Sequence, residues 1–341
     1  MKNKLLVICG QTATGKTSLG IDIAKKFKGE ILSADSRQVY KKLDVGTGKI
    51  DRNTKYIIRR TELGVLYILN NSTRIWCYDL VEPAENFSVS QYFDAARNIT
   101  ADIWTRGKLS IIIGGTGLYI KALTDGIDTI SVNPDESLRK ELNSKSVSEL
   151  YETLINIDPQ RAGEMNQSDR KNPRRLVRGI EIAKKVSSIK YQVSGEKEDN
   201  RNENPAIDNG NNGLNYDSLL MVGLTAEKKI IDERIEKRVA QRLEMGFEDE
   251  IKKLLKTGID WKCGSMSSMG YRQYEDFYKG NIDIDEFAGR WIEEEKKYAK
   301  RQMVWFKKDK RIHWFDVSKK DYRIDVEKSV ESWYYEVGRD K

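Results

Sequence analysis

The segment Gly10–Thr17 (GQTATGKT) has the residue types and the spacing of a phosphate-binding loop. In such a loop the glycines let backbone N–H groups surround an anion, and the N-terminus of the following helix adds positive potential. Lys16 can neutralise the outer phosphate, and the Thr17 hydroxyl can bind Mg²⁺. We therefore expect a di- or triphosphate to be held by eight residues: Gly10, Gln11, Thr12, Ala13, Thr14, Gly15, Lys16 and Thr17.

Two further polar residues follow apolar segments. Asp35 comes directly after Gly29–Ala34, where its carboxylate can hold Mg²⁺-bound water or act as a general base; it can also cap a helix that begins at Ser36. Thr116 lies in the glycine-rich turn after Leu109–Ile113, where it can hydrogen-bond a substrate or belong to a plain strand-to-helix turn. Both residues are candidates for the chemistry beside the bound phosphates.

Basic and amide side chains supply candidate anion-binding groups. Arg37 and Gln38 offer donors for a base edge or a phosphate. The segment Arg170–Arg178 holds five basic residues and no acidic one. Arg174 and Arg178 are i, i+4 neighbours on a predicted helix, so they share a face that either follows a phosphate backbone or is simply solvated.

Two later segments are also basic. Arg234 and Arg238 repeat the i, i+4 spacing; an arginine here can close over a diphosphate, or it can pair with Glu233 or Glu236. The segment 290–311 holds nine basic and four acidic residues, and its basic face is a candidate for nucleic acid. Its aromatic residues recur every seven positions and predict the buried stripe of a long helix: Trp291, Tyr298 and Trp305.

The composition narrows the possible chemistry. The 341 residues include 60 basic and 53 acidic ones, a net charge of +7 that mildly favours a polyanionic partner. His313 is the single histidine, which argues against a Ser-His or Cys-His catalytic pair. The three cysteines are far apart and indicate neither a disulfide framework nor a zinc site. The first strand begins almost at the N-terminus, so we expect a cytoplasmic protein without a membrane segment.

These residues need a scaffold that brings them together. The apolar segments 5–9, 29–34 and 109–113 each end in a polar or glycine-rich turn, as the parallel strands of an α/β sheet do. Ligands bind at the carboxyl ends of such strands. We therefore predict an α/β fold with a core like that of the phosphate-loop nucleotide-binding proteins, and one crevice that contains Lys16, Asp35 and Thr116.

The rest of the chain divides by composition into further regions. Residues 1–131 form the first part of the core, and the helical, polar pattern of 132–193 predicts a small inserted domain. Residues 194–215 are polar and predict a flexible loop. We assign a returning core strand, 216–224, and helices to 216–318, and a C-terminal tail to 319–341.

With these motifs in place, the sequence resembles the tRNA dimethylallyltransferases (tRNA isopentenyltransferases) over nearly its whole length. Seven stretches carry the resemblance in the same order: Gly10–Thr17, Ser33–Lys41, Asp44–Lys49, Gly114–Ile120, Asn172–Arg175, Met269–Arg272 and Tyr298–Phe306. Departures include Gln11 and Thr14 where proline and serine are usual, and the absence of a pair of histidines after the second motif.

The resemblance implies a reaction and a role for each motif. A dimethylallyl group would pass from dimethylallyl diphosphate to N6 of the adenosine 3′ of a tRNA anticodon (position 37). Lys16 and Arg238 would neutralise the diphosphate, Thr17 would contact Mg²⁺, Asp35 would be the base and Thr116 would lie beside the reacting centre. The anticodon stem-loop would be bound by the insertion and by a set of matching residues: Asp35, Ser36, Arg37, Gln38, Arg174, Arg175, Arg178, Gly270, Tyr271 and Arg272.

Three other functions are compatible with parts of this pattern. A small-molecule or nucleoside kinase would bind ATP with the same loop and use Asp35 for phosphoryl transfer, but it leaves the basic helices unexplained. An isopentenyltransferase for free adenine nucleotides would need no tRNA-binding insertion. A non-catalytic RNA-binding protein would need neither Lys16 nor Asp35. We expect the chain to act as a monomer.

Overall fold

The computed structural model describes residues 2–49, 54–70, 72–127, 129–130, 132, 134–194 and 213–336. The chain divides into two compact units, one of Met1–Asp125 with Leu214–Lys341 and one of Gly126–Gly213, so the second unit is inserted into the first. Most of the polar segment predicted to be a flexible loop, residues 195–212, lies outside the described residues. No helix in the described part of the chain is long and apolar enough to cross a membrane.

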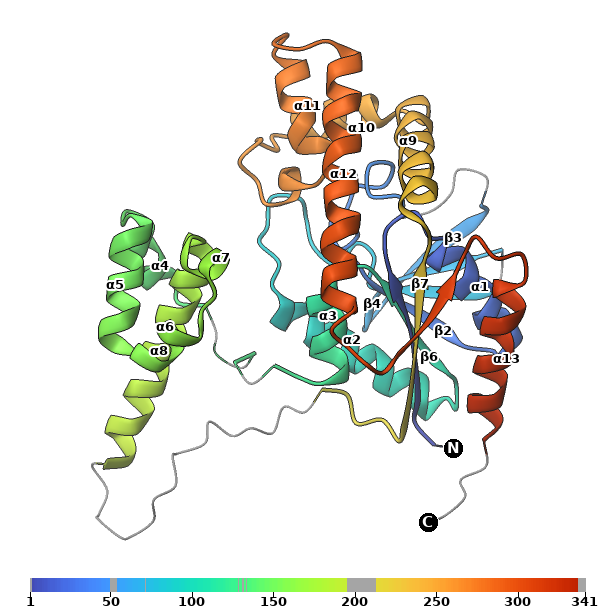
Figure 1. Cartoon of the computed structure of the whole chain (residues 1–341), viewed down its shortest axis with the longest axis horizontal. Helices are drawn as coiled ribbons and strands as arrows, with labels where there is room; N and C mark the ends of the chain where they lie inside the picture. Colours follow the sequence, from blue (N-terminus) through green and yellow to red (C-terminus); the bar gives the residue numbers. More distant parts are fainter. Residues whose placement is uncertain are drawn as a thin grey trace. The chain divides into compact units, whose positions relative to one another are not determined.

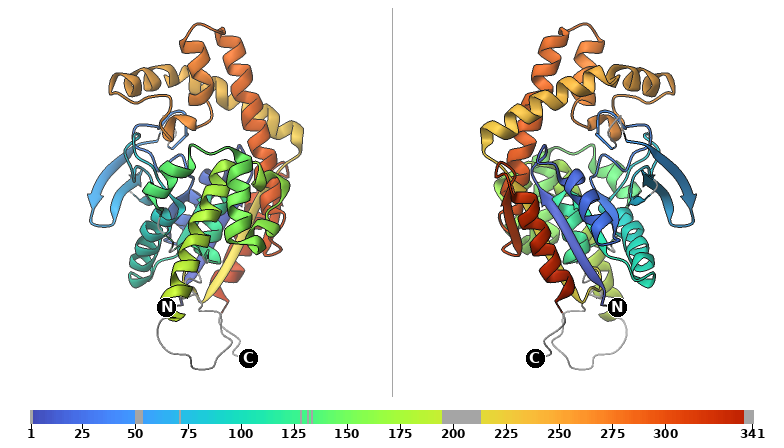
Figure 2. Two further views of the ribbon diagram at one scale, coloured as in Figure 1. Left: turned by 90° about the vertical axis from the view of Figure 1, so that its left-hand side faces the viewer. Right: turned by 90° about the vertical axis from the view of Figure 1, so that its right-hand side faces the viewer.

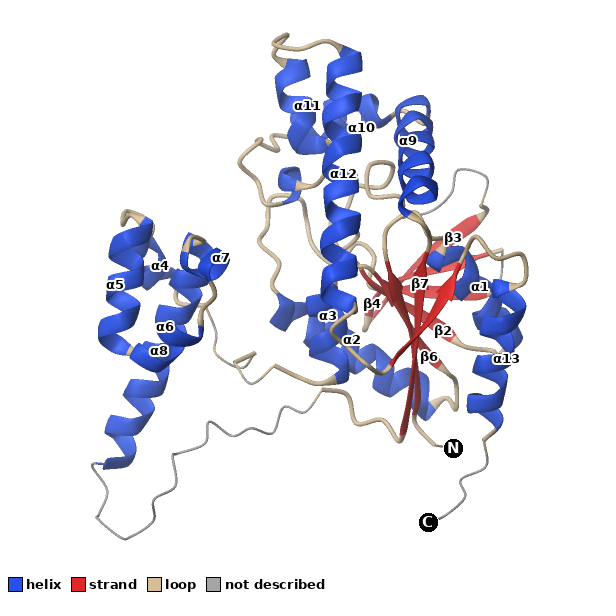
Figure 3. Ribbon diagram, viewed as in Figure 1, coloured by secondary structure: helices blue, strands red, loops and turns tan. Residues whose placement is uncertain are grey.

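The first unit is built on a sheet with the strand order β3-β4-β5-β2-β6-β1-β7-β8 (Figures 1 and 3). Its central strands are parallel and apolar because helices cover both of their faces. They confirm the predicted α/β core and the four predicted strands, with these bounds: β1 Lys4–Gly10, β2 Glu30–Ala34, β6 Ser110–Gly114 and β7 Ser218–Thr225.

The strands at both edges of this sheet were not predicted. β3 (Tyr56–Thr61) and β4 (Gly64–Leu69) form an antiparallel hairpin beside β5 (Thr73–Trp76), and Figure 2 shows this light-blue hairpin at the outer edge of the sheet. β8 (Ile312–Asp316) pairs in parallel with β7 at the other edge. Every β3 side chain is exposed and β8 has one buried residue, so neither segment carries the apolar pattern of a core strand.

Helices cover the two faces of the sheet. α1 (Lys16–Lys26) and α13 (Tyr322–Tyr335) lie on one face, and α2 (Val89–Thr105) and α3 (Gly117–Thr124) lie on the other (Figure 1). α1 lies so close to the sheet that a Cβ at Gly20 would stand 1.9 Å from Ile113 Cδ1. The assignment of 319–341 to a tail is corrected by α13, whose Val326 and Val330 are fully buried in the core.

Four helices gather beyond the carboxyl ends of the central strands (Figure 1): α9 Lys228–Glu244, α10 Phe247–Lys256, α11 Tyr271–Tyr278 and α12 Ile284–Phe306. The seven-residue aromatic stripe predicted for α12 is only partly right, because Trp291 is buried whereas Trp305 is 43% exposed. The buried residues of α12 instead recur every three or four positions, as an α-helix requires: Phe287, Trp291, Glu295, Ala299, Gln302 and Phe306. Two of them, Glu295 and Gln302, are polar.

The second unit is a helical domain with its own apolar core. Its helices are α4 Glu136–Leu142, α5 Val147–Ile157, α6 Pro159–Glu164, α7 Gln167–Arg170 and α8 Pro173–Ser194, close to the predicted helical segments. Leu142, Leu154 and Ile180 are almost fully buried within it. The chain places side-chain caps at several helix starts, including a reciprocal pair of hydrogen bonds between Ser146 and Glu149.

A buried carboxylate stabilises the end of the sheet that is opposite the carboxyl ends of the strands. Glu30 has a 1% exposed side chain and accepts hydrogen bonds from Arg106, Lys108 (2.9 Å) and Trp76 Nε1 (2.9 Å). Burial alone would raise the pKa of Glu30, but these donors outweigh it and hold the pKa at about 2. The carboxylate therefore stabilises the fold at every pH at which it stays ionised.

We expect this carboxylate to make folding stability depend on acid pH. Because the pKa of Glu30 lies below its value of 4.5 when unfolded, its contribution is complete above pH 4.5 and is lost as the pH falls toward 2. The free energy of unfolding should fall by about 2 kcal/mol. The loss is no larger because the partner cations are about one-third exposed and solvent screens them. Denaturant unfolding from pH 7 to pH 3 measures this, and Glu30→Gln should flatten the dependence while the exposed Glu327→Gln should not.

Candidate active site

A cavity of about 1060 Å³ opens at the carboxyl ends of the central strands of the first unit. Its walls come from the phosphate loop, the turn after β2, the loop 45–49, the segment 267–272 and the facing sides of α9 and α12. Of the three residues predicted to share one crevice, it contains Lys16 and Asp35 but not Thr116. It brings together many of the residues predicted for catalysis, for the diphosphate and for tRNA: Thr12, Ala13, Gly15, Lys16, Thr17, Asp35, Ser36, Arg37, Gln38, Arg238 and Arg272.

The phosphate loop has the backbone shape that its sequence predicts. Gly10 has φ 125°, and a Cβ there would stand 2.2 Å from the Leu224 carbonyl oxygen, so only glycine fits. Lys16 Nζ donates to the carbonyl oxygens of Gly10 (3.1 Å) and Gln11 (2.6 Å). Burial, with the charge of Arg238 nearby, lowers the pKa of Lys16 to about 8. An anion inside the loop would favour the charged ammonium.

The carboxylate of Asp35 belongs to a tight turn and not to a helix. Residues 36–39 form turns, so the alternative that Asp35 caps a helix starting at Ser36 is wrong. Asp35 Oδ1 accepts a hydrogen bond from Arg37 N (2.8 Å), which leaves Oδ2 without a partner among the described residues. Thr116 Oγ1 accepts from Ser36 N (3.0 Å). Thr116 therefore supports the Asp35 turn from the end of β6 and is not itself among the residues that line the cavity.

Arg37 and Gln38 hold neighbouring loops. Arg37 Nη1 donates to the Gly264 carbonyl oxygen (3.1 Å). Gln38 accepts from Ser33 Oγ (2.7 Å) and donates to the carbonyl oxygens of Thr47 and Gly48, both at 3.2 Å. Both side chains line the cavity, and these contacts of the Gln38 amide and of Arg37 Nη1 fix the cavity walls.

Glu250 was not predicted from the sequence, although it organises the loop 44–49. Its carboxylate accepts hydrogen bonds from three successive backbone N–H groups, of Asp44 (2.7 Å), Val45 (2.8 Å) and Gly46 (3.1 Å), and from the Tyr271 hydroxyl. The sequence could not single out Glu250, because a solvated glutamate on a charged helix such as α10 gives the same pattern. Its role is visible only once α10 is placed over the loop.

The prediction that Gly270 and Tyr271 contact RNA is corrected by their burial. The Tyr271 side chain is fully buried against Phe247, and its hydroxyl is committed to Glu250. Gly270 has φ 86°, and a Cβ there would stand 2.6 Å from the ring of Trp291. Both residues fix the local backbone, whereas Arg272 lines the cavity with a 57% exposed side chain whose ion pair with Glu294 is long at 3.8 Å.

An ionic cluster lies between α9, α12 and the phosphate loop. Arg238 Nη2 donates to Thr12 Oγ1 (2.7 Å) and to Glu295, and Arg242 Nη1 donates to Glu295 Oε1 (2.8 Å). Neither Glu233 nor Glu236 pairs with Arg238 among the described contacts, so the local ion pair considered as an alternative is not formed. Two arginines thus share one buried carboxylate, and Lys16 lines the same cavity, so the positive charge beside the phosphate loop favours an anion.

Gln302 on α12 also reaches the phosphate loop; it lies in the matching stretch Tyr298–Phe306, but no role was predicted for it. Its Oε1 accepts from Thr12 N (2.7 Å), and its Nε2 donates to the Gly115 carbonyl oxygen (3.0 Å). The side chain is buried. It therefore ties the loop to the end of β6 and sets the spacing between the diphosphate site and the Asp35 turn.

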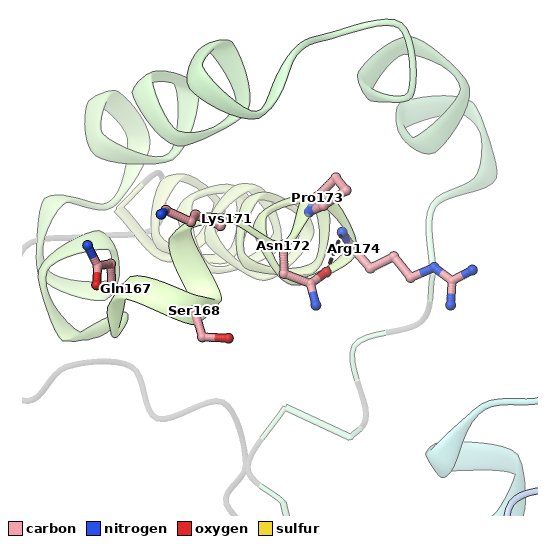
Figure 4. Close-up of a pocket in the computed structure, with 6 residues that line it drawn as sticks. All are labelled: Gln167, Ser168, Lys171, Asn172, Pro173 and Arg174. Carbon is pink, nitrogen blue, oxygen red and sulfur yellow. Dashed lines mark hydrogen bonds between the residues drawn. The ribbon is translucent and has the colours of Figure 1, made fainter. Parts of the chain in front are cut away.

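The second unit holds the remaining predicted tRNA-binding residues. Figure 4 shows an open pocket at the start of α8, lined by Gln167, Ser168, Lys171, Asn172, Pro173 and Arg174, with the Arg174 side chain extending away from it. Arg174 and Arg175 are exposed. Arg178 does not share their role, because it donates to the carbonyl oxygens of Thr129 and Val132, both at 2.8 Å, and pairs with Glu181. The predicted joint surface of Arg174 and Arg178 is therefore corrected.

Comparison with known proteins identifies the family. The sequence pattern of the IPP transferases matches residues 38–309, and that of the isopentenyl transferases matches residues 3–65. The chain is 34% identical to the tRNA dimethylallyltransferase of Finegoldia magna, over 98% of this chain and 99% of the relative. It is also 34% identical to that of Halalkalibacterium halodurans, over 94% of each chain.

Solved structures agree with these relatives. The full-length tRNA isopentenylpyrophosphate transferase of Bacillus halodurans aligns with a TM-score of 0.65 and 31% identity, over 97% of this chain and 96% of that one. A eukaryotic dimethylallyltransferase acting on tRNA aligns with a TM-score of 0.74 at 23% identity, over 99% of this chain and 81% of that one, and supports the fold. The chain belongs to the tRNA dimethylallyltransferase family.

Proposed function

We propose that this enzyme transfers a dimethylallyl group from dimethylallyl diphosphate to N6 of the adenosine directly 3′ of a tRNA anticodon. The observation that carries the proposal is the single cavity in which the phosphate loop, with Lys16 and Arg238, faces the carboxylate of Asp35. Membership in the tRNA dimethylallyltransferase family supports the substrate pair. The loop would therefore hold a diphosphate leaving group and not the ATP that such loops usually bind.

The donor end of the cavity suits a diphosphate with Mg²⁺. Loop N–H groups, Lys16 and Arg238 would bind its oxygens. The Thr17 hydroxyl lies at the cavity and has no hydrogen-bond partner among the described residues, so it fits a hard cation that prefers oxygen ligands. Bound there, Mg²⁺ would neutralise charge that develops on the leaving diphosphate.

The transfer step uses Asp35 as the base. N6 attacks C1 of the dimethylallyl group, the C1–O bond breaks, and its electron pair leaves with the diphosphate. The proton on N6 passes to the carboxylate of Asp35, whose Oδ2 is left free by the Arg37 turn. Lys16 and Arg238 stabilise the negative charge of the leaving group in the same step.

The acceptor is a base taken out of the anticodon loop. An adenine in a loop must unstack to enter a cavity, which costs a few kcal/mol that contacts to the RNA backbone offset. Arg272 at the cavity, and Arg174 and Arg175 on the second unit, are exposed cations suited to such contacts. We propose that these residues, with the Asp35 turn, bind the anticodon stem-loop, and that the enzyme acts as a monomer.

Incubation with labelled dimethylallyl diphosphate, Mg²⁺ and a tRNA that carries adenosine after the anticodon tests this function. Label should appear on N6 of that adenosine, with one diphosphate released for each group transferred. The same tRNA with guanosine at that position is the matched control and should stay unlabelled. Transfer to AMP but not to tRNA, or ATP turnover without RNA, would contradict the proposal.

A further inference from the structure

Glu295 is a buried carboxylate that the transfer step does not use directly. Its side chain is 2% exposed, on the face of α12 that points toward α9. The residues before and after it on this face are apolar, Trp291 and Ala299, both buried. An ionised group in such a place is strongly disfavoured unless its partners repay the lost hydration, so its contacts need an explanation.

Two of the three side chains that bind this carboxylate, Arg238 and Arg242, line the cavity that holds the diphosphate site. One oxygen, Oε2, accepts from Arg238 Nη2, the same nitrogen that donates to Thr12 Oγ1 in the phosphate loop. The other oxygen, Oε1, accepts from Arg242 Nη1 (2.8 Å) and from Trp291 Nε1 (3.2 Å). Burial would raise the pKa of Glu295, but the two arginines outweigh it and hold the pKa below its usual value.

Arg238 is held with part of its guanidinium unused. Its Nε is buried and has no hydrogen-bond partner among the described residues, although Nη2 has two. A buried donor without a partner is costly in a resting protein, and an anion in the loop would supply the missing acceptor. The hydrogen bonds of the guanidinium are thus made by Nη2, and Nε remains a donor for an anion.

Arg242 keeps the cluster attractive to anions. A carboxylate paired with Arg238 alone would cancel its charge, whereas a second arginine leaves the three groups with a net charge of +1. Arg242 is itself buried, lies over the Trp291 ring (5.8 Å) and approaches Gly48 closely, where a Cβ would stand 2.7 Å from its Nη2. It is therefore fixed between the cluster and the loop 44–49.

We propose that Glu295 and Arg242 form a positioning pair that holds Arg238 against the phosphate loop and thereby sets the affinity for the diphosphate of the donor. The proposal rests on the proposed function, because it assigns the diphosphate as the anion that Arg238 meets. In this proposal both residues act through Arg238, although both also line the cavity. A purely structural ion pair would instead change stability and leave the affinity for the anion unaltered.

The test is a cycle of variants measured with inorganic pyrophosphate and Mg²⁺ by titration calorimetry. Glu295→Asp keeps the charge but withdraws the carboxylate by one methylene, so the Kd for pyrophosphate should rise about tenfold. In an Arg238→Met background the same change should alter Kd less than about twofold, because the residue through which Glu295 acts is gone. Glu293→Asp, at an exposed position of the same helix, is the matched control and should leave Kd unchanged.

Several outcomes would overturn the proposal. Equal rises in both backgrounds would mean a general distortion, and an unchanged Kd for folded Glu295→Asp would mean that the pair is only structural. If Glu295→Asp unfolds, Arg242→Lys, which keeps the charge without the planar fork, should raise Kd several-fold in the same cycle. Because pyrophosphate binding needs no RNA, a wild-type enzyme that binds it but transfers no dimethylallyl group would contradict only the proposed function.

Discussion

Replacing Asp35 by Asn should slow dimethylallyl transfer by about 10²- to 10⁴-fold at saturating donor and tRNA, the usual contribution of a general base. The amide can still accept the hydrogen bond from Arg37 N, so the turn keeps its shape. It cannot take the proton from N6. Since the turn and the neighbouring Ser36 and Arg37 stay in place, tRNA affinity should change less than about threefold.

Single-turnover rates and filter binding of tRNA separate these two effects. Asp35→Ala also removes the acceptor of the turn, so it should lose activity and some tRNA affinity as well. Asp94→Asn makes the same chemical change at an exposed position of α2 and should behave as wild type. Weaker tRNA binding with a normal single-turnover rate in Asp35→Asn would exclude Asp35 as the base.

The residues that could be predicted from sequence share one property: their role depends on neighbours along the chain. Lys16 and Thr17 stand in a loop with fixed spacing between a strand and a helix, and Asp35 follows directly on an apolar strand. Parallel strands align their carboxyl ends, so the convergence of these residues follows from the strand pattern alone. The structure confirms that Lys16 and Asp35 line one cavity, and it moves Thr116 behind the Asp35 turn.

The residues that sequence reasoning missed act across elements far apart in the chain. Glu250 binds a loop about 200 positions away, and Glu295 binds Arg238 from a different helix. Glutamates that bind distant groups from charged helices have no local signal, because a solvated glutamate produces the same pattern. The same reason explains the error at Arg178, since its carbonyl partners near Thr129 cannot be inferred from the spacing of arginines on α8.

The second large effect concerns Lys16, whose replacement by Met should lower kcat/KM for dimethylallyl diphosphate by about 10²- to 10³-fold. Methionine has nearly the same length but no charge for the leaving diphosphate. Since the residues proposed to bind tRNA, Arg272 and the Asp35 turn among them, are unaltered, tRNA binding should not change. A higher KM for tRNA together with an unchanged kcat/KM for the donor would contradict this role.

The pH dependence gives Lys16 a signature that no structural defect reproduces. With a pKa of about 8 in the free enzyme, the ammonium loses its proton as the pH rises above 8, while a bound diphosphate favours the charged form. Pyrophosphate affinity should therefore fall from pH 7 to pH 9, and binding near pH 8 should take up a proton. Titrations in buffers of different ionisation enthalpy measure that proton. Lys16→Met is the control, because pyrophosphate itself titrates in the same way with the variant and with the wild type. The difference between the two pH profiles therefore reports the lysine alone. Identical profiles would show that another group titrates.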